Sequence, residues 1–464
     1  MSFLSKIYAV SPVFIQNVFI SLYGYYWKYR RYGGNFKVNI SECKNRENYT
    51  ATEWENYQTV ELRKLLIHAF ETVPFYNKLY SKSGFNAADF KSFELSDLKK
   101  LPCLSKDDVR KFGTTSLLSS NRRKGNFYNS SGSTGTPVKI FFSKEVQRKW
   151  NALFEARVRN WAGVNHTMSR AMIGGRRVLP KPTLKSPYYR INKAESQIYF
   201  SAYHITANTA PDYLSGLKKH KPDYLIGYAV SIYLLSKFII DQKLNPPILK
   251  AVLTSSEKLT EKMRLTIEKA FKCKVFDAYS GMEACGLISE NRFGELLFSP
   301  DSGIMEVLDE DGNEVKNGTF GEVIATGFLN YDQPLIRYRI GDRVTLTKDQ
   351  KAKSGVNMPV VEAIEGRIED TITGINGNQM VRFHSVFAGI SSIVMAQVVQ
   401  ESLNKILVKL VVDKSYNREN EQHIKNRIRS QLGAVTVNFE YLTAIEQAKN
   451  GKFKAVISNL NNEQ

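Results

Sequence analysis

Long apolar runs are missing from this chain of 464 residues. Residues 7–27 are apolar and aromatic, but Pro12, Gln16, Asn17 and Gly24 interrupt them. A bilayer-spanning helix needs about 20 consecutive apolar residues, so this region does not predict one. It does not resemble a signal peptide either, because the expected small-residue cleavage site does not follow.

Cysteines are few and scattered. They lie far apart and form no CxxC pair, which argues against a disulfide framework and a zinc ribbon. A reducing cytoplasm fits this usage best, so we expect a cytoplasmic protein. The four cysteines are Cys43, Cys103, Cys273 and Cys285.

Signatures of nucleic-acid binding are missing too, although the net charge is +20, from 65 basic and 45 acidic residues. We find no zinc-finger spacing, no basic zipper with heptads and no aromatic RNA-binding motif. We therefore expect no nucleic acid among the partners.

Acidic residues are absent from two basic stretches. Residues 1–40 combine five basic residues with many aromatic ones. Residues 1–50 are therefore either a membrane-surface segment on the cytoplasmic face, drawn to anionic lipid, or a packed helical segment with a solvated basic end. Residues 156–194 contain nine basic residues, and we expect an anionic substrate or cofactor to pass over this surface.

Hydrophobic residues make up 42% of the chain and aromatic residues 12%, which is ample for a packed core. Apolar positions recur at helical spacing through residues 54–82, with "TVP" as a stop between two helices. Between residues 222 and 290 strands alternate with helices, which predicts a parallel α/β sheet with ligands at the carboxyl ends of its strands. Antiparallel patterns follow residue 295, and a β-α-β pattern follows residue 366.

The stretch "NSSGSTGTPV" (residues 129–138) holds five hydroxyl side chains, two glycines and a proline. Glycine and hydroxyl residues can turn backbone N–H groups toward an anion such as phosphate. A surface linker has the same composition. The alternating run at residues 138–143 predicts a strand directly after the loop.

Four further stretches accompany this loop in a fixed order. They are "DAYSGME" (277–283), "RYRIGD" (337–342), "GRIED" (366–370) and "NGKFKAV" (450–456). The ordered set resembles the adenylate-forming superfamily, and within it the phenylacetate-CoA ligases and the CapK-type capsular polysaccharide biosynthesis proteins. The resemblance covers nearly the whole chain.

This resemblance implies an α/β fold in two domains. Residues 1–365 would form a large AMP-binding domain with parallel α/β sheets and a small β-rich subdomain. Residues 366–464 would form a small α+β domain that carries the catalytic lysine, Lys452. A lysine between the carboxylate and the α-phosphate would bring two anions together in the first half-reaction. Glu369 and Asp370 match the hinge of the small domain.

The resemblance also implies ATP and Mg²⁺ as cofactors. Tyr279 would stack on adenine, and Glu283 would hold Mg²⁺ and act in catalysis. Asp342 would accept the ribose hydroxyls, with Arg367 assisting. Further nucleotide contacts would come from Ser130, Ser131, Gly132, Ser133, Thr134, Gly135, Ser256, Glu257 and Asp277.

The implied reaction joins a small carboxylic acid to an acceptor. The acceptor would be coenzyme A, or a sugar amine in surface polysaccharide synthesis, and the acid itself is not indicated. An alternative is an inactive AMP-binding-fold scaffold of a polysaccharide assembly complex. His204 could contact substrate or be a hydrogen-bonded core residue, and we expect Cys285 to be buried by small-residue packing.

Overall fold

The computed structural model describes residues 3–129, 138–176, 178–179, 186–367, 372–375, 379–380, 384–387, 390, 392–446 and 453–460. The chain divides into two compact units. Unit 1 comprises residues 1–340 and 345–363, and unit 2 comprises residues 341–344 and 364–464.

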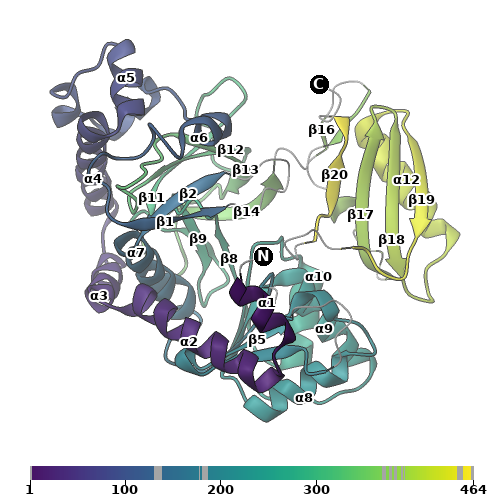
Figure 1. Ribbon diagram of the computed structural model, residues 1–464. Coiled ribbons are helices and arrows are strands. Elements are labelled where there is room, and N and C mark those ends of the chain that lie inside the picture. Colours follow the sequence, from purple (N-terminus) through teal and green to yellow (C-terminus); the bar gives the residue numbers. More distant parts are fainter. Residues whose placement is uncertain are drawn as a thin grey trace. The chain divides into compact units, whose positions relative to one another are not determined.

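The first part of unit 1 is helical (Figure 1). Helix α4 begins with a capping box, in which Thr50 and Glu53 satisfy each other's backbone N–H groups. It ends before Pro74, which takes the first position of α5, where its missing N–H costs nothing. The predicted stop at "TVP" is therefore confirmed. These helices are α1 (Phe3–Val10), α2 (Val13–Tyr32), α3 (Phe36–Arg46), α4 (Ala51–Thr72), α5 (Pro74–Lys82), η1 (Asp89–Ser92), η2 (Leu95–Lys100) and α6 (Lys106–Phe112).

A mixed sheet of twelve strands follows, in the order β11-β12-β13-β14-β10-β9-β8-β7-β6-β3-β5-β4. Its strands β5, β3, β6, β7 and β8 are mutually parallel, as the alternation of strands and helices predicts. They are β3 (Arg170–Gly174), β4 (Tyr189–Asn192), β5 (Gln197–Ser201), β6 (Tyr224–Tyr228), β7 (Ala251–Ser255) and β8 (Val275–Ser280).

Helices cross over between these parallel strands and bury an apolar face against them (Figure 1). Tyr213, Ile232 and Phe271 come from three different helices and are all fully or almost fully buried in this core. These three crossover helices are α8 (Ala210–His220), α9 (Ala229–Asp241) and α10 (Glu261–Phe271). The other helices of this part of the chain are α7 (Lys144–Phe154), η3 (Glu155–Arg159), η4 (Lys193–Glu195) and η5 (Ala202–His204).

The later strands of this sheet pair antiparallel with β8 and with one another, which confirms the antiparallel pattern expected after residue 295. A separate antiparallel pair, β1 and β2, flanks residues 130–137. These strands are β1 (Gly125–Asn129), β2 (Lys139–Ser143), β9 (Leu287–Glu290), β10 (Leu296–Phe298), β11 (Gly303–Leu308), β12 (Phe320–Gly327), β13 (Tyr338–Leu346) and β14 (Val360–Arg367).

Unit 2 has its own core, built on a four-stranded sheet of order β19-β18-β17-β20. Ile424 and Ile428 of α12 are fully buried in that core. The β-α-β pattern predicted for this part is confirmed. Its elements are β15 (Ile372–Thr373), β16 (Gln379–Met380), α11 (His384–Phe387), β17 (Ile393–Ser402), β18 (Lys405–Val412), α12 (Arg418–Leu432), β19 (Thr436–Tyr441) and β20 (Val456–Ser458).

Four arginines of the basic stretch 156–194 do not lie on the charged surface that its composition predicts. Arg157, Arg159, Arg170 and Arg190 are buried. The first three are paired with carboxylates, and Arg190 donates to the side-chain oxygen of Gln16. The prediction is wrong for these four because their acidic and polar partners lie mostly outside the stretch, where a local count of charges misses them.

No helix among the described residues is long and apolar enough to cross a bilayer.

Candidate active site

The carboxyl ends of β6, β7 and β8 lie side by side. Tyr228 is in register with Ser255, and Ser255 is in register with Ala278. Strand β8 and the chain segments that leave β7 and β8 carry five of the predicted site residues. Because parallel strands end at one edge of a sheet, these segments meet where α/β folds bind ligands. The five are Ser256, Glu257, Asp277, Tyr279 and Glu283.

Ser256 and Glu257 form the turn after β7. Ser256 has a φ of 72°, a left-handed conformation that is strained for a side chain other than glycine and that clusters at functional sites. Oε2 of Glu257 accepts a hydrogen bond of 2.9 Å from the backbone N–H of Val230. That N–H belongs to the first turn of α9, where the helix dipole favours a negative charge. The contact ties the β7 turn to the end of β6.

Glu283 follows β8 in a turn that contains Gly281. A Cβ atom on Gly281 would lie 2.3 Å from Oε2 of Glu283, so any larger residue there would displace the carboxylate. Ala284, the next residue, has a φ of 51°. The position of the glycine in "YSGME" therefore makes room for the Glu283 side chain at the end of the strand.

Asp277 lies partly buried in a polar network on β8. Its Oδ1 accepts a hydrogen bond of 2.8 Å from Oγ1 of Thr254 on β7. Its backbone N–H donates to Oε2 of Glu290, which also pairs with Arg264 at 2.8 Å. The pKa of Asp277 is raised to about 6, mainly by desolvation and also by the nearby Glu290 carboxylate, although the Thr254 hydrogen bond lowers it.

Sequence reasoning missed Thr254, Arg264 and Glu290, which support this edge of the sheet. Thr254 could have been found from the sequence, because it begins the stretch "TSSEKL" (residues 254–259), which also contains Ser256 and Glu257. Glu290 was not, because it reaches Asp277 only through the antiparallel pairing of β9 with β8.

Comparisons with known proteins show which proteins the chain resembles. Residues 374–459 match the family model described as the CapK C-terminal domain. Protein CapK of Staphylococcus aureus is 27% identical over 98% of this chain and 100% of its own length. The phenylacetate-coenzyme A ligase of Escherichia coli (strain K12) is 24% identical over 71% of this chain and 75% of its own.

These matches support an adenylate-forming ligase, and the chain is similar to Protein CapK over nearly its whole length. A crystal structure of 2-hydroxyisobutyryl-CoA ligase in the postadenylation state shares the fold of this ligase, with a TM-score of 0.69. It covers 90% of this chain and 92% of that one, at 20% sequence identity. The expected fold class is thus confirmed.

The remaining predicted residues of the ligase do not belong to β8 or to the segments that leave β7 and β8. Asp342 is buried on β13, in the short segment that clusters with unit 2. Arg367 ends β14, and its side chain lies outside the described residues. The strand predicted after the loop is confirmed as β2. Outside the described residues lie Ser130, Ser131, Gly132, Ser133, Thr134, Gly135, Glu369, Asp370 and Lys452.

Two residues for which the sequence allowed a structural role have one in this ligase. Nδ1 of His204 forms a hydrogen bond of 2.7 Å with Oγ of Ser201. Cys285 is buried. A Cβ atom added to Gly327 would lie 2.8 Å from the Cβ of Cys285. The expected small-residue packing around Cys285 is confirmed.

The donor set of this ligase suits Mg²⁺ better than a structural metal. Among the described residues no group of three or more His, Cys, Asp or Glu side chains could hold a metal ion. Magnesium in nucleotide enzymes needs only one or two carboxylates, because phosphates and water complete its shell. The partly exposed carboxylate of Glu283 meets that requirement.

Proposed function

We propose that this ligase activates a carboxylic acid with ATP as an acyl-adenylate and then transfers the acyl group to an acceptor. Support for the proposal comes from the carboxyl edge of adjacent parallel strands, where Tyr279 lies on β8 and where Glu257 and Glu283 lie in the segments that follow β7 and β8. An aromatic ring, a hydrogen-bond acceptor and a metal-binding oxygen at one edge suit a nucleotide.

In this proposal each residue has a separate task. Tyr279 stacks on adenine while Asp342 and Arg367 hold the ribose, which fixes the α-phosphate for attack. Glu283 holds Mg²⁺, which neutralises charge on the phosphates. The loop at residues 130–135 donates hydrogen bonds to the departing pyrophosphate.

Lys452 brings the acid to the nucleotide. Its ammonium group would bridge the attacking carboxylate oxygen and the α-phosphate, offsetting the repulsion between two anions. Attack forms the bond between this oxygen and the α-phosphorus and releases pyrophosphate. Rotation of unit 2 about Glu369 and Asp370 would then withdraw Lys452 and admit the acceptor.

The acceptor in this proposal is coenzyme A or the amine of a sugar, in capsular or surface polysaccharide biosynthesis. Support comes from relatives of two kinds, phenylacetate-coenzyme A ligases and Protein CapK. The cytoplasm is the proposed compartment, since all four cysteines are free thiols.

The test is ATP–pyrophosphate exchange by the full chain with a panel of amino, hydroxy, aromatic and sugar acids. We expect exchange with one class of acid and a loss of about 100- to 1000-fold in Lys452→Ala and in Glu283→Gln. Lys454→Ala and Glu310→Gln are the matched controls and should keep the wild-type rate.

Either of two results would overturn the proposal. One is exchange that persists in Lys452→Ala. The other is ATP binding without exchange for every acid, which would favour the inactive scaffold.

A further inference from the structure

Helix α2 exposes an apolar and aromatic face to solvent. Phe14, Val18, Leu22, Tyr25 and Tyr29 are each more than half exposed. At 3.6 residues per turn their directions fall within about 80° of one another, so they form one stripe, which we call the α2 stripe. Of the twenty exposed large hydrophobic residues among the described ones, nine lie between residues 10 and 29.

The opposite face of α2 is already occupied by unit 1. Asn17 accepts a hydrogen bond of 2.9 Å from the backbone of Ile191, and Arg30 donates one of 2.7 Å to the carbonyl oxygen of Phe142. Gly24 lies so close to Asn192 that a Cβ atom there would lie 2.0 Å from its Oδ1. These contacts fix the rotation of the helix, so the α2 stripe cannot turn inward.

Positive charge surrounds one end of the α2 stripe. Nζ of Lys144 lies 5.3 Å from the centre of the Tyr29 ring, and the guanidinium carbon of Arg148 lies 5.4 Å from it. Residues 1–40 contain no acidic residue. An apolar helix face with cations at its border is the pattern of a helix that lies in the membrane interface.

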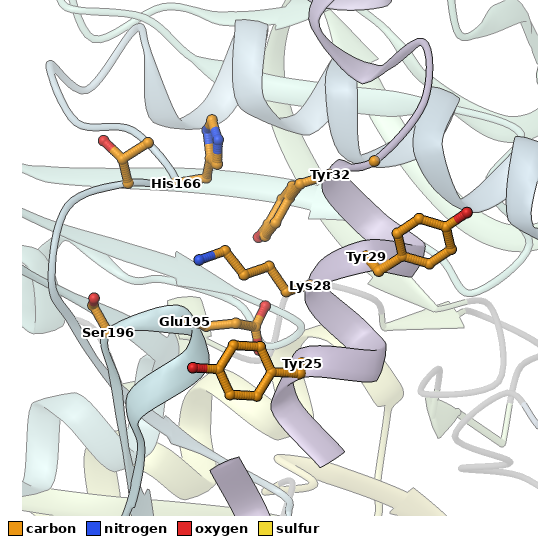
Figure 2. Close-up of a pocket in the computed structure, with 9 residues that line it drawn as sticks. Tyr25, Lys28, Tyr29, Tyr32, His166, Glu195 and Ser196 are labelled. Atoms are coloured by element: carbon orange, nitrogen blue, oxygen red, sulfur yellow. The ribbon is translucent and has the colours of Figure 1, made fainter. Parts of the chain in front are cut away.

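A cavity of about 470 Å³ opens beside the same end of the stripe, and Tyr25, Lys28 and Tyr29 contribute to its lining. In Figure 2 the ammonium group of Lys28 extends between Tyr32 and Glu195, whereas Tyr29 points away from them. Among the described residues Lys28 forms no ion pair.

The carboxylate in this cavity is neutralised. Glu195 pairs with Arg31 at 3.0 Å and with Arg170 at 3.4 Å. His166, another lining residue, has its Nδ1 at 2.9 Å from Oε1 of Glu155. Within the part of the chain that the structure describes, the ammonium group of Lys28 has no counter-charge, so the cavity suits an anionic group such as a phosphodiester.

We propose that the α2 stripe docks on a bilayer containing anionic phospholipid, and that the Lys28 cavity receives a lipid headgroup phosphate. The apolar and tyrosine side chains would insert into the interface, while Lys28, Lys144 and Arg148 would contact headgroups. A second copy of this chain is a poorer occupant, because a two-fold contact would bring these cations together.

The experiment is co-sedimentation of the full chain with vesicles of phosphatidylcholine alone and of an equal mixture with phosphatidylglycerol. We expect at least about tenfold stronger binding to the mixture. The double variant Phe14→Ser, Leu22→Ser should lose about tenfold or more of this binding. Lys28→Gln should lose about three- to fivefold and show a shallower dependence on salt.

The matched control is the double variant Ile248→Ser, Leu265→Ser, which replaces residues 89% and 58% exposed elsewhere in unit 1. It should bind as the wild type does. Equal binding by both double variants, or no binding of the wild type to either vesicle, would overturn the proposal. Light scattering on the same proteins tests the alternative occupant, a second copy of this chain. In that case the wild type and the control variant would be dimers, and only the Phe14→Ser, Leu22→Ser variant would be a monomer.

Discussion

Two stretches of this protein look alike in composition and differ in structure. Residues 1–40 and 156–194 are both basic and both lack acidic residues. In the second stretch Arg157 is fully buried between Glu47 and Asp301. In the first, Lys28 is exposed beside an open cavity. Arg157 therefore belongs to the interior of unit 1, whereas Lys28 lies on its surface.

The difference shows what decides whether a basic residue is available to a ligand. A buried guanidinium is tolerated only when carboxylates and carbonyl oxygens satisfy it, and those of Arg157 come from α3, from the turn after it and from the segment before β11. Local composition cannot reveal such partners. Of the three predictions below, the first and the last test how far the two stretches differ, and the second tests a carboxylate outside both.

The largest effect is expected for Asp301→Ala. Asp301 accepts hydrogen bonds of 3.2 Å from Arg46 and 3.1 Å from Arg157. Its removal leaves a buried guanidinium short of a counter-charge and should lower the free energy of unfolding by about 3–5 kcal/mol. Urea denaturation measures this, and Asp311→Ala on an exposed turn is the control. A loss no larger than that of the control would mean that Arg157 does not depend on Asp301.

Replacing the partly buried Asp277, which has an acidic neighbour, should stabilise the protein at neutral pH, whereas replacing Asp301 should destabilise it. The pKa of Asp277 is about 6 in the folded protein, above its ordinary 3.8, so the folded state binds this proton more tightly than the unfolded chain does. The resulting stabilisation is complete below about pH 4 and is lost as the pH rises through about 6.

Asp277→Asn should remove this titration. At pH 7.5 the variant should be more stable than the wild type by about 1–3 kcal/mol, with a smaller difference at pH 5. Urea denaturation at the two pH values measures it, with Asp311→Asn as the control. Parallel pH profiles for Asp277→Asn and the wild type would contradict the assigned pKa.

The smallest effect is expected for Lys28→Gln. Its side chain is exposed, so the free energy of unfolding should change by no more than about 0.5 kcal/mol. Thermal and urea unfolding of this variant beside Asp301→Ala would complete the comparison. If the free energy of unfolding fell by more than about 1 kcal/mol, Lys28 would support the fold as Arg157 does, which would contradict the prediction.

Much of the architecture follows from local patterns. Apolar spacing located α4 and α5, and Pro74 located the boundary between them. The alternation of short β-rich runs with helical runs predicted the parallel strands, and hence the edge at which Ser256, Glu257 and Glu283 follow β7 and β8. Resemblance to the adenylate-forming enzymes then supplied roles for these residues, and those roles remain predictions.

Other features could not be predicted in this way. Nothing around Asp277 in the sequence indicates that Glu290 lies beside it, because antiparallel pairing brings the two together. Similarly, the spacing of Phe14, Val18 and Leu22 predicts an amphipathic helix but not which of its faces is covered. Here the covered face is the more polar one, held by residues such as Asn17 and Arg30.

The sequence by itself determined the order of strands and helices, the absence of a long apolar helix and the kinship with adenylate-forming ligases, because each depends on residues that are close in the chain. Tertiary structure decided which arginines are buried, which aspartate has a raised pKa and which face of α2 meets solvent. Those properties depend on desolvation and on partners distant in sequence. Burial and charge pairing exist only once distant segments have packed together.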